Sequence, residues 1–326
     1  MRNALRRLAA AVLALTGLTI APALAQQAAW PSRQVTFIIP FIAGGSADII
    51  GRALADHVGR VIGQTVVVEN RGGAGGNVGA AAVAKAAPDG YTILVGSTGP
   101  AATNTLMYKN LSFNSQRDFV PIALIGKTPV IIVARPDAPV KSLKELITYA
   151  KANPDTLSAG FPGNGTLGHI TGVLLSQQSG VALKQVQYRG GASIINDLLG
   201  GHIDIGMDAM TPYVPIVDSG KLRALAVGGA VRSKQLPDVP TVAEAGLPGF
   251  EASVWYCLLA PTGVPAEVIA KLNAATNAYL KTPKAHDLFD KLGVVPEGGT
   301  PAEAKAFITA EVKRWGPVVK AAKISF

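Results

Sequence analysis

The sequence contains a single cysteine, Cys257, among 326 residues. One thiol excludes an internal disulfide and any zinc or iron–sulfur site that needs several cysteines. Charged residues make up only 16% of the chain, and no run of five or more Lys or Arg occurs although the formal net charge is +9. Scattered positive charge of this kind argues against a nucleic-acid-binding protein. The 48% hydrophobic content excludes a disordered chain.

The chain has one long apolar run near its start, Leu8–Ile20, which is shorter than the roughly 20 residues needed to span a bilayer. Basic residues precede the run, and the small-x-small site Ala23–Ala25 follows it. This order predicts an exported protein whose signal peptide, residues 1–25, is cleaved before Gln26. An N-terminal anchor helix is the alternative. No cysteine lies near the cleavage point, which excludes lipid attachment there.

The common catalytic motifs are also missing. The four histidines form no H-E-x-x-H pair, and no serine stands in G-x-S-x-G. Gly163–Gly168 matches G-x-G-x-x-G, but the next acidic residue, Asp197, comes too late for a dinucleotide site. We therefore expect no enzyme, no metal and no cofactor. An exported hydrolase that uses Ser46 or Ser97 with His169 as its base stays open as an alternative, although no spacing supports it.

Strand-like and helix-like patterns alternate along most of the chain, which is typical of an α/β protein with largely parallel sheets. Two apolar strands, Val120–Ala134 and Val254–Leu259, are candidates for passages between two domains. Three helical patterns follow the second strand. We expect one domain of residues 26–126 plus 253–326 and a second domain of residues 127–252.

Four strand-to-helix turns are rich in glycine and small hydroxyl residues: Gly44–Asp48, Gly96–Gly99, Gly163–Thr166 and Gly190–Ser193. Ligands of open parallel sheets bind at the carboxyl ends of the strands, where such turns gather. The first N–H groups of a helix lack partners within the helix and carry partial positive charge, so they suit a carboxylate or phosphate. Each turn alone is compatible with an ordinary loop. Four together indicate a ligand cleft.

Three polar residues near these turns have two interpretations each. His169 lies one turn into a helix, where it either lines the cleft or stabilises local structure. Asp48 and Asp208 lie at a helix start and a strand end, and each is compatible with a structural role. Asp48 alternatively orients a water molecule or a ligand hydroxyl.

Several motifs together resemble one known family. They include Pro40-x-x-x-Gly44-Gly45-x-x-Asp48-x-x-x-Arg52, Asn70–Gly79, Pro88–Thr92, Gly165-Thr166-x-x-His169, Gln187–Gly191, Asp197–Asp204, Leu222–Val227, Val239–Gly246 and Trp255-Tyr256-x-Leu258–Pro261. The chain resembles, from about Pro31 onward, the substrate-binding proteins of tripartite tricarboxylate transporters, the Bug family of periplasmic solute receptors. It departs from the pattern at Phe41–Ala43, which lines the presumed pocket entrance, at Arg189 and at Cys257.

The resemblance implies an α/β, type II periplasmic binding protein fold, in which two α/β domains joined by two crossing strands close on a ligand. It implies a cleft with one wall from Gly44, Gly45, Ser46 and Asp48, near Ser97 and Thr98. The facing wall would contain Gly163, Asn164, Gly165, Thr166 and His169. Phe41 would lie at the entrance, and Ala192, Ser193 and Asp208 would meet the variable end of the ligand.

The resemblance also implies the function. Relatives typically bind a small carboxylate, such as a di- or tricarboxylate, an acidic amino acid or an aromatic acid, and deliver it to the permease subunits of a tripartite tricarboxylate transporter. We accordingly expect a monomeric periplasmic receptor. A periplasmic ligand sensor that serves a signalling membrane protein is the alternative.

Overall fold

The computed structural model describes residues 29–321 and 323–326, so the predicted signal peptide lies outside the described residues. Residues 33–326 form one compact unit. No helix in the described part of the chain is both long enough and apolar enough to cross a membrane.

The described strands form one ten-stranded sheet, and β4 joins its two halves. The strands are β1 (Val35–Ile39), β2 (Val66–Asn70), β3 (Thr92–Ser97), β4 (Phe119–Ala134), β5 (Ser158–Phe161), β6 (Lys184–Gln187), β7 (Ile205–Ala209), β8 (Arg223–Val227), β9 (Ser253–Pro261) and β10 (Val295–Pro296). The main order is β2-β1-β3-β9-β4-β7-β5-β6, and β8 and β10 also pair with β4.

β4 is a single strand of 16 residues that belongs to both halves of the sheet. Its first part, Phe119–Pro129, pairs with β9, and its last part, Val130–Ala134, pairs with β7 and β8. The expectation of largely parallel sheets is wrong. Five of the nine pairings between described strands are antiparallel, and each of the five includes β4 or β9. The placement of the domain boundaries at 126/127 and 252/253 stays a prediction.

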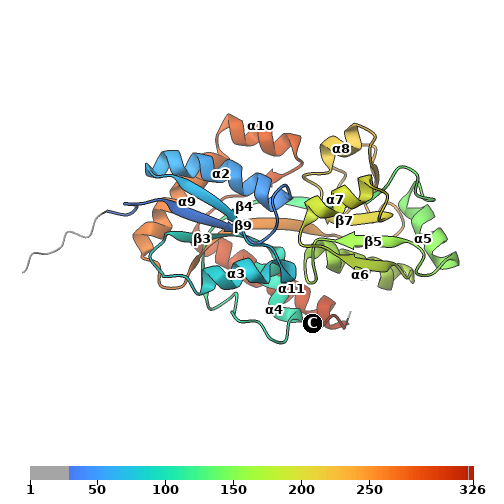
Figure 1. Cartoon of the computed structure of the whole chain (residues 1–326), viewed down its shortest axis with the longest axis horizontal. Helices are drawn as coiled ribbons and strands as arrows, with labels where there is room; N and C mark the ends of the chain where they lie inside the picture. Colours follow the sequence, from blue (N-terminus) through green and yellow to red (C-terminus); the bar gives the residue numbers. More distant parts are fainter. Residues whose placement is uncertain (1–28, 322) are drawn as a thin grey trace, which may run out of the picture. The chain divides into compact units, whose positions relative to one another are not determined.

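Helices cover both faces of the sheet. They are α2 (Ser46–Ile62), α3 (Asn77–Ala84), α4 (Asn104–Met107), α5 (Leu143–Ala152), α6 (Leu167–Ser179), α7 (Gly191–Leu199), α8 (Val214–Asp218), α9 (Ala266–Leu280), α10 (Pro283–Lys291) and α11 (Pro301–Ala321). The short turns η1 (Ala74–Gly76) and η2 (Gly99–Thr103) precede α3 and α4. Helices α2, α9 and α10 lie on one side of the β1–β3–β9 half, and α3, α4 and α11 lie on the other (Figure 1).

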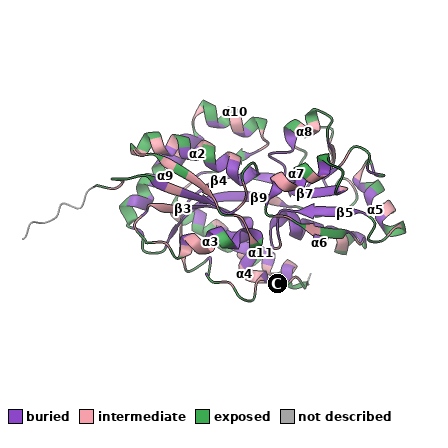
Figure 2. Ribbon diagram, viewed as in Figure 1, coloured by how far each residue is buried: buried purple, intermediate pink, exposed green. Residues whose placement is uncertain are grey.

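Each half of the sheet has its own apolar core. One cluster packs β3 and β9 against α3 and α11, and it includes Leu94, Trp255 and Ile308. The other packs β4 against α7, and it includes Ile131 and Ile194. Strands β1, β3, β4, β5, β7 and β9 are buried along most of their length, whereas the outer faces of the helices are exposed (Figure 2). Because burial of apolar area is the dominant favourable term in folding, these two cores fix the positions of the strand ends.

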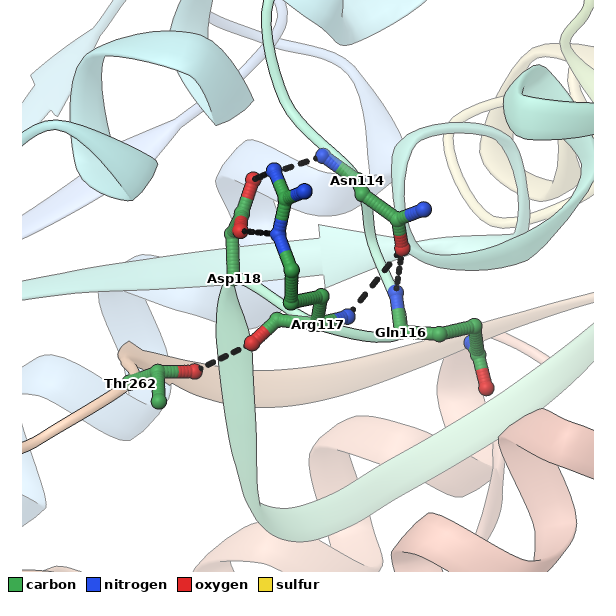
Figure 3. A network of polar contacts seen from close by, with 5 residues as sticks. All are labelled: Asn114, Gln116, Arg117, Asp118 and Thr262. Carbon is green, nitrogen blue, oxygen red and sulfur yellow. Dashed lines mark hydrogen bonds and ion pairs between the residues drawn. The ribbon is translucent and has the colours of Figure 1, made fainter.

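Hydrogen bonds fasten the start of β4 to the end of β9. Asp118 accepts from the backbone N–H of Asn114 at 2.7 Å and pairs with Arg117 at 2.6 Å (Figure 3). The Thr262 hydroxyl donates to the backbone carbonyl of Arg117 at 2.6 Å. The loop before β4 is thereby tied to the residue that follows β9.

Three sequences typical of helix starts behave differently in the structure. Ser46 is the first residue of α2, and Gly45 is the N-cap, without a side-chain bond. Thr241 and Glu244 form both hydrogen bonds of a capping box, but the chain makes only turns there. Ser142 caps α5 by accepting from the N–H of Glu145, whose carboxylate accepts from the N–H of Lys141.

Candidate functional site

A small cavity of about 40 Å³ lies where the two halves of the sheet meet. Its lining residues come from both halves: Phe41, Gly45, Ser46, Ala47, Ser97, Thr98, Gly99, Pro162, Thr166, Leu167, Gly168, Gly191, Asp208, Ala209, Val254 and Tyr256. The strand ends and the helix starts therefore meet around one small space.

Three helices begin at the cavity. Gly45–Ala47 starts α2, Thr166–Gly168 starts α6, and Gly191 starts α7. The first N–H groups of each helix have no acceptor within the helix and carry the positive end of its dipole. A group of such termini is a ready site for an anion.

The remaining walls come from strands. Ser97 ends β3, Pro162 follows β5, and Ala209 ends β7. These are carboxyl ends of strands, the edge of an α/β sheet at which ligands bind. Val254 and Tyr256, two residues apart on β9, complete the lining from the shared strand.

Asp208 is the only ionisable side chain of the lining apart from the tyrosine, and none of the described lining residues is basic. Its Oδ1 accepts from the backbone N–H of Ala209 at 2.7 Å. Burial raises the pKa of the Asp208 carboxyl to about 7, although this hydrogen bond opposes the rise. Asp208 therefore titrates near neutral pH.

Three hydroxyl groups in the lining are hydrogen-bonded to the protein. The Ser46 hydroxyl lies 3.5 Å from the carbonyl oxygen of Ala209, across the cavity. Thr98 Oγ1 accepts from the backbone N–H of Trp255 at 3.1 Å. Thr166 donates to the carbonyl of Gly163 at 2.7 Å and caps α6. These bonds fix the wall on which a ligand would lie.

Asp48 lies behind the first wall. Arg52 Nε donates to it at 2.9 Å, Asn70 at 2.8 Å, and the backbone N–H of Gly44 at 3.0 Å. Burial would raise the pKa of Asp48, but these hydrogen bonds outweigh it and hold the pKa below its usual value. The carboxylate stabilises the turn before α2 and does not line the cavity.

His169 also lies behind its wall, only 4% exposed. Its Nδ1 accepts from the backbone N–H of Gly165 at 3.4 Å, and its Nε2 lies 3.2 Å from Gln185 Oε1. Burial lowers the pKa of His169, although the bond to Gln185 opposes this. A hydrolase would need this imidazole as a base, but both ring nitrogens are engaged away from the cavity.

The loop Gly163–Gly165 faces the opposite half of the molecule. Tyr108 Oη donates to the carbonyl of Asn164 at 2.8 Å, and Thr103 Oγ1 donates to that of Gly165 at 3.2 Å. A Cβ on Gly75 would lie 2.0 Å from the Asn164 oxygen, so only glycine allows this approach. These contacts join the two halves and define a closed arrangement.

Seven predicted site residues line the cavity: Phe41, Gly45, Ser46, Ser97, Thr98, Thr166 and Asp208. Eight do not: Gly44, Asp48, Gly163, Asn164, Gly165, His169, Ala192 and Ser193. Of these eight, Gly44 is close to Ala192, since a Cβ on Gly44 would lie 3.4 Å from the Ala192 Cβ. Contact of any of the fifteen with a ligand stays a prediction.

Tyr256 and Val254 also line the cavity, although no sequence motif marks them as site residues. Their spacing of two along an apolar strand places both on one face, which is a signal for a shared surface but not for a cavity. Gly191 and Gly168 were missed as lining residues, although both lie in or next to predicted glycine-rich turns. Within residues 29–321 and 323–326, no cluster of three His, Cys, Asp or Glu side chains is arranged to hold a metal ion.

Two sheet halves that share β4, with helix N-termini directed at a cavity between them, define the class of the periplasmic binding proteins. Comparison with known proteins identifies the family. The family model for the tripartite tricarboxylate transporter family receptor matches residues 50–324. The chain belongs to this family, whose members are receptors that bind solutes and are not enzymes.

Individual relatives agree over nearly the whole chain. Protein BugT of Bordetella pertussis is 36% identical over 292 residues, which cover 89% of this chain and 90% of BugT. The structure of Rhodopseudomonas palustris Rpa4515 with adipate is 36% identical and has a TM-score of 0.88, with 91% and 99% of the two chains covered. The R. palustris protein MatC with bound malate is 34% identical and has a TM-score of 0.86, with 89% and 100% covered.

Proposed function

We propose that this receptor captures a small organic carboxylate in the cavity and delivers it to the permease subunits of a tripartite tricarboxylate transporter. The observation that carries the proposal is the convergence of the α2 and α6 N-termini on a cavity without a basic side chain. Preorganised N–H dipoles hold an anion without a buried arginine or lysine. Two relatives were solved with adipate and malate, both of which are carboxylates.

The candidate ligands are a di- or tricarboxylate, an acidic amino acid or an aromatic acid. One carboxylate would accept hydrogen bonds from the N–H groups of Ser46 and Ala47 on one side and of Leu167 and Gly168 on the other. Because these groups belong to opposite halves, an anion between them stabilises the closed arrangement over an open one. Closure by hinge motion would then present the loaded receptor to its permease.

We also propose export to the periplasm with cleavage after Ala25, on the strength of the basic start, the apolar run and the small-x-small site. Mass spectrometry of the protein purified from the periplasm tests this. An intact N-terminus in that fraction would contradict the cleavage.

Thermal denaturation against a panel of mono-, di- and tricarboxylates, amino acids and aromatic acids tests the binding function. A ligand at 100 times its Kd adds about 2.7 kcal/mol of apparent stability, so a true ligand raises Tm clearly. Unfolding, dialysis and refolding before a second panel removes any ligand acquired during purification. Turnover of a ligand by the protein, or a refolded protein that ignores every carboxylate, would overturn the proposal.

A further inference from the structure

Asp208 is a buried acid on the cavity wall, where the proposed function calls for an anionic ligand. It is 8% exposed, and no described residue that lines the cavity carries positive charge. An ionised carboxylate in a small cavity repels a second one strongly, because little solvent screens the pair. An ionised Asp208 would therefore weaken the binding of a simple dianion.

The surroundings of Asp208 supply few donors to its carboxylate. Oδ1 accepts from the N–H of Ala209, and Oδ2 lies against the backbone of Gly191, where an added Cβ would lie 2.0 Å away. The Asp208 carboxylate therefore packs against the first residue of α7, and the N–H of Ala209 is its one hydrogen-bond donor among the described residues. Of the three helix starts at the cavity, the α7 start already has an anion against it.

Two buried tyrosines lie near the same carboxylate. The pKa of Tyr213 and that of Tyr256 are raised by burial and by the charge of Asp208, so both hydroxyls stay neutral. Tyr256 is hydrogen-bonded to Ser46. The hydroxyl of Tyr213 has no hydrogen-bond partner among the described residues, but it lies outside the cavity lining. Neither tyrosine can neutralise Asp208.

The charged groups on the neighbouring elements are engaged elsewhere. On α7, Asp197 accepts from the Tyr188 hydroxyl at 2.6 Å. On α2, Asp48 pairs with Arg52 at 2.9 Å. His169 of α6 is turned toward Gln185. On β4, which pairs with β7, the residue opposite Asp208 is the apolar Ile131, and Val227 of β8, on the far side of β4, is also apolar. The carboxylate of Asp208 thus lacks a counter-ion in the described part of the chain.

We infer that Asp208 selects the ligand by the group at its free end, and that the ligand is a carboxylate whose other end donates a hydrogen bond, as a hydroxyl or an ammonium does. This inference rests on the proposed function, since it assumes a carboxylate held between α2 and α6. A donor at the free end completes the hydrogen bonding of the Asp208 carboxylate. A second ionised carboxylate there meets a like charge, and sites built to pair a donor reject analogues without one.

Two series of acids test this, because their members differ only in the group at one end. The four-carbon probes are 4-aminobutyrate, 4-hydroxybutyrate, butyrate and succinate, and the six-carbon probes are 6-aminohexanoate, 6-hydroxyhexanoate, hexanoate and adipate. Titration calorimetry at pH 8 with the processed protein should rank the amino or hydroxy acid at least tenfold tighter than the dicarboxylate of equal length. Between pH 8 and pH 6.5, the dicarboxylate should gain affinity and the amino acid should lose it.

Substituting Asp208 separates the effect of its charge from the effect of its size. Asp208→Asn keeps the size of the side chain, and it should remove both pH trends and weaken the amino acids at least tenfold relative to the dicarboxylates. Asp218→Asn is the matched control, because this aspartate is exposed at the end of α8 and does not line the cavity. If Asp208→Asn does not fold, the ranking and the pH trends of the unmodified protein still decide.

The outcomes separate the two proposals. Carboxylates that bind with no preference at the free end, or an unchanged ranking in Asp208→Asn, overturn the role of Asp208 and leave the receptor function standing. Failure of every carboxylate, in these series and in the wider panel, overturns both.

Discussion

Gly191→Ala tests how closely the Asp208 carboxylate packs on the start of α7. An added Cβ would lie 2.0 Å from Asp208 Oδ2 and 3.2 Å from Cγ, and the first distance is shorter than any real Cβ contact. The aspartate or the helix must therefore move by roughly 1 Å, and overpacking of this kind costs about 1–3 kcal/mol. The backbone at this position is not left-handed, so the cost comes from the contact and not from strain.

The assay is chemical denaturation, followed by the carboxylate panel on the same variant. Gly316→Ala is the control, because it lies inside α11 with open space where its Cβ would go. Pro317 follows this glycine, so the better helix propensity of alanine is offset by the crowding of a Cβ before proline, and we expect little change in the stability of the control. We expect Gly191→Ala to lose about 1–3 kcal/mol and to bind its carboxylate more weakly. A variant as stable as Gly316→Ala, with unchanged binding, would refute the close packing.

Three further predictions concern the contact of Tyr108 with Asn164 and the buried titratable groups. Tyr108→Phe removes the hydrogen bond from Tyr108 to the carbonyl of Asn164, which joins the two halves. The variant should bind its ligand more weakly by about 0.5–1.5 kcal/mol in calorimetry, with little effect on the two apolar cores. An unchanged affinity would contradict a role of this bond in closure. His169→Gln should flatten the pH dependence of the free energy of unfolding. The folded protein lowers the pKa of this imidazole, so the stabilisation from its neutral form is lost as pH falls below 6.5, the unfolded pKa. An unchanged dependence of the free energy of unfolding on pH, measured by urea denaturation between pH 5 and 8, would refute this. Asp208→Asn should raise the free energy of unfolding by an amount on the order of 2 kcal/mol at pH 8 and by less at pH 5. A carboxyl whose pKa is raised to about 7 in the folded state stabilises that state at low pH, and this stabilisation is lost as pH rises through 7. Equal gains at both pH values would show that the charge of Asp208 is not buried.

Local residue patterns predicted most helices and strands. They failed for strand direction and for the ends of helices and turns, which depend on contacts distant in the sequence. The capping box at Ser142 and Glu145 opens a helix because apolar positions continue after it. Thr241 and Glu244 also form a capping box, in which the Glu244 carboxylate accepts from the N–H of Thr241 itself, but Gly246 and Pro248 follow and end the turn. Apolar strand patterns give burial and not direction, so the antiparallel pairing of β4 and β9 was not predictable from them.

The site was predictable where glycine-rich turns start helices. Ser46 and Thr166 lie on the cavity because the N–H groups of α2 and α6 do. Tyr256 was not predictable, since an aromatic residue within a buried strand resembles any core residue. Nor was the position of His169, because the side of the wall on which a helical residue falls depends on how α6 packs against β7.

The placement of the loop before α6 explains how binding and closure are linked. Its carbonyls, on Asn164 and Gly165, accept from Tyr108 and Thr103 of the opposite half, whereas the N–H groups of the helix that follows point to the cavity. One short segment therefore offers acceptors to the closing half and donors to an anion. In the proposed hinge opening the two halves would separate and neither set would keep all its partners. An anion on the donors and the opposite half on the acceptors would then stabilise the same closed state. On this proposal, substitutions at the contacts of Tyr108 and Thr103 change ligand affinity without touching the ligand.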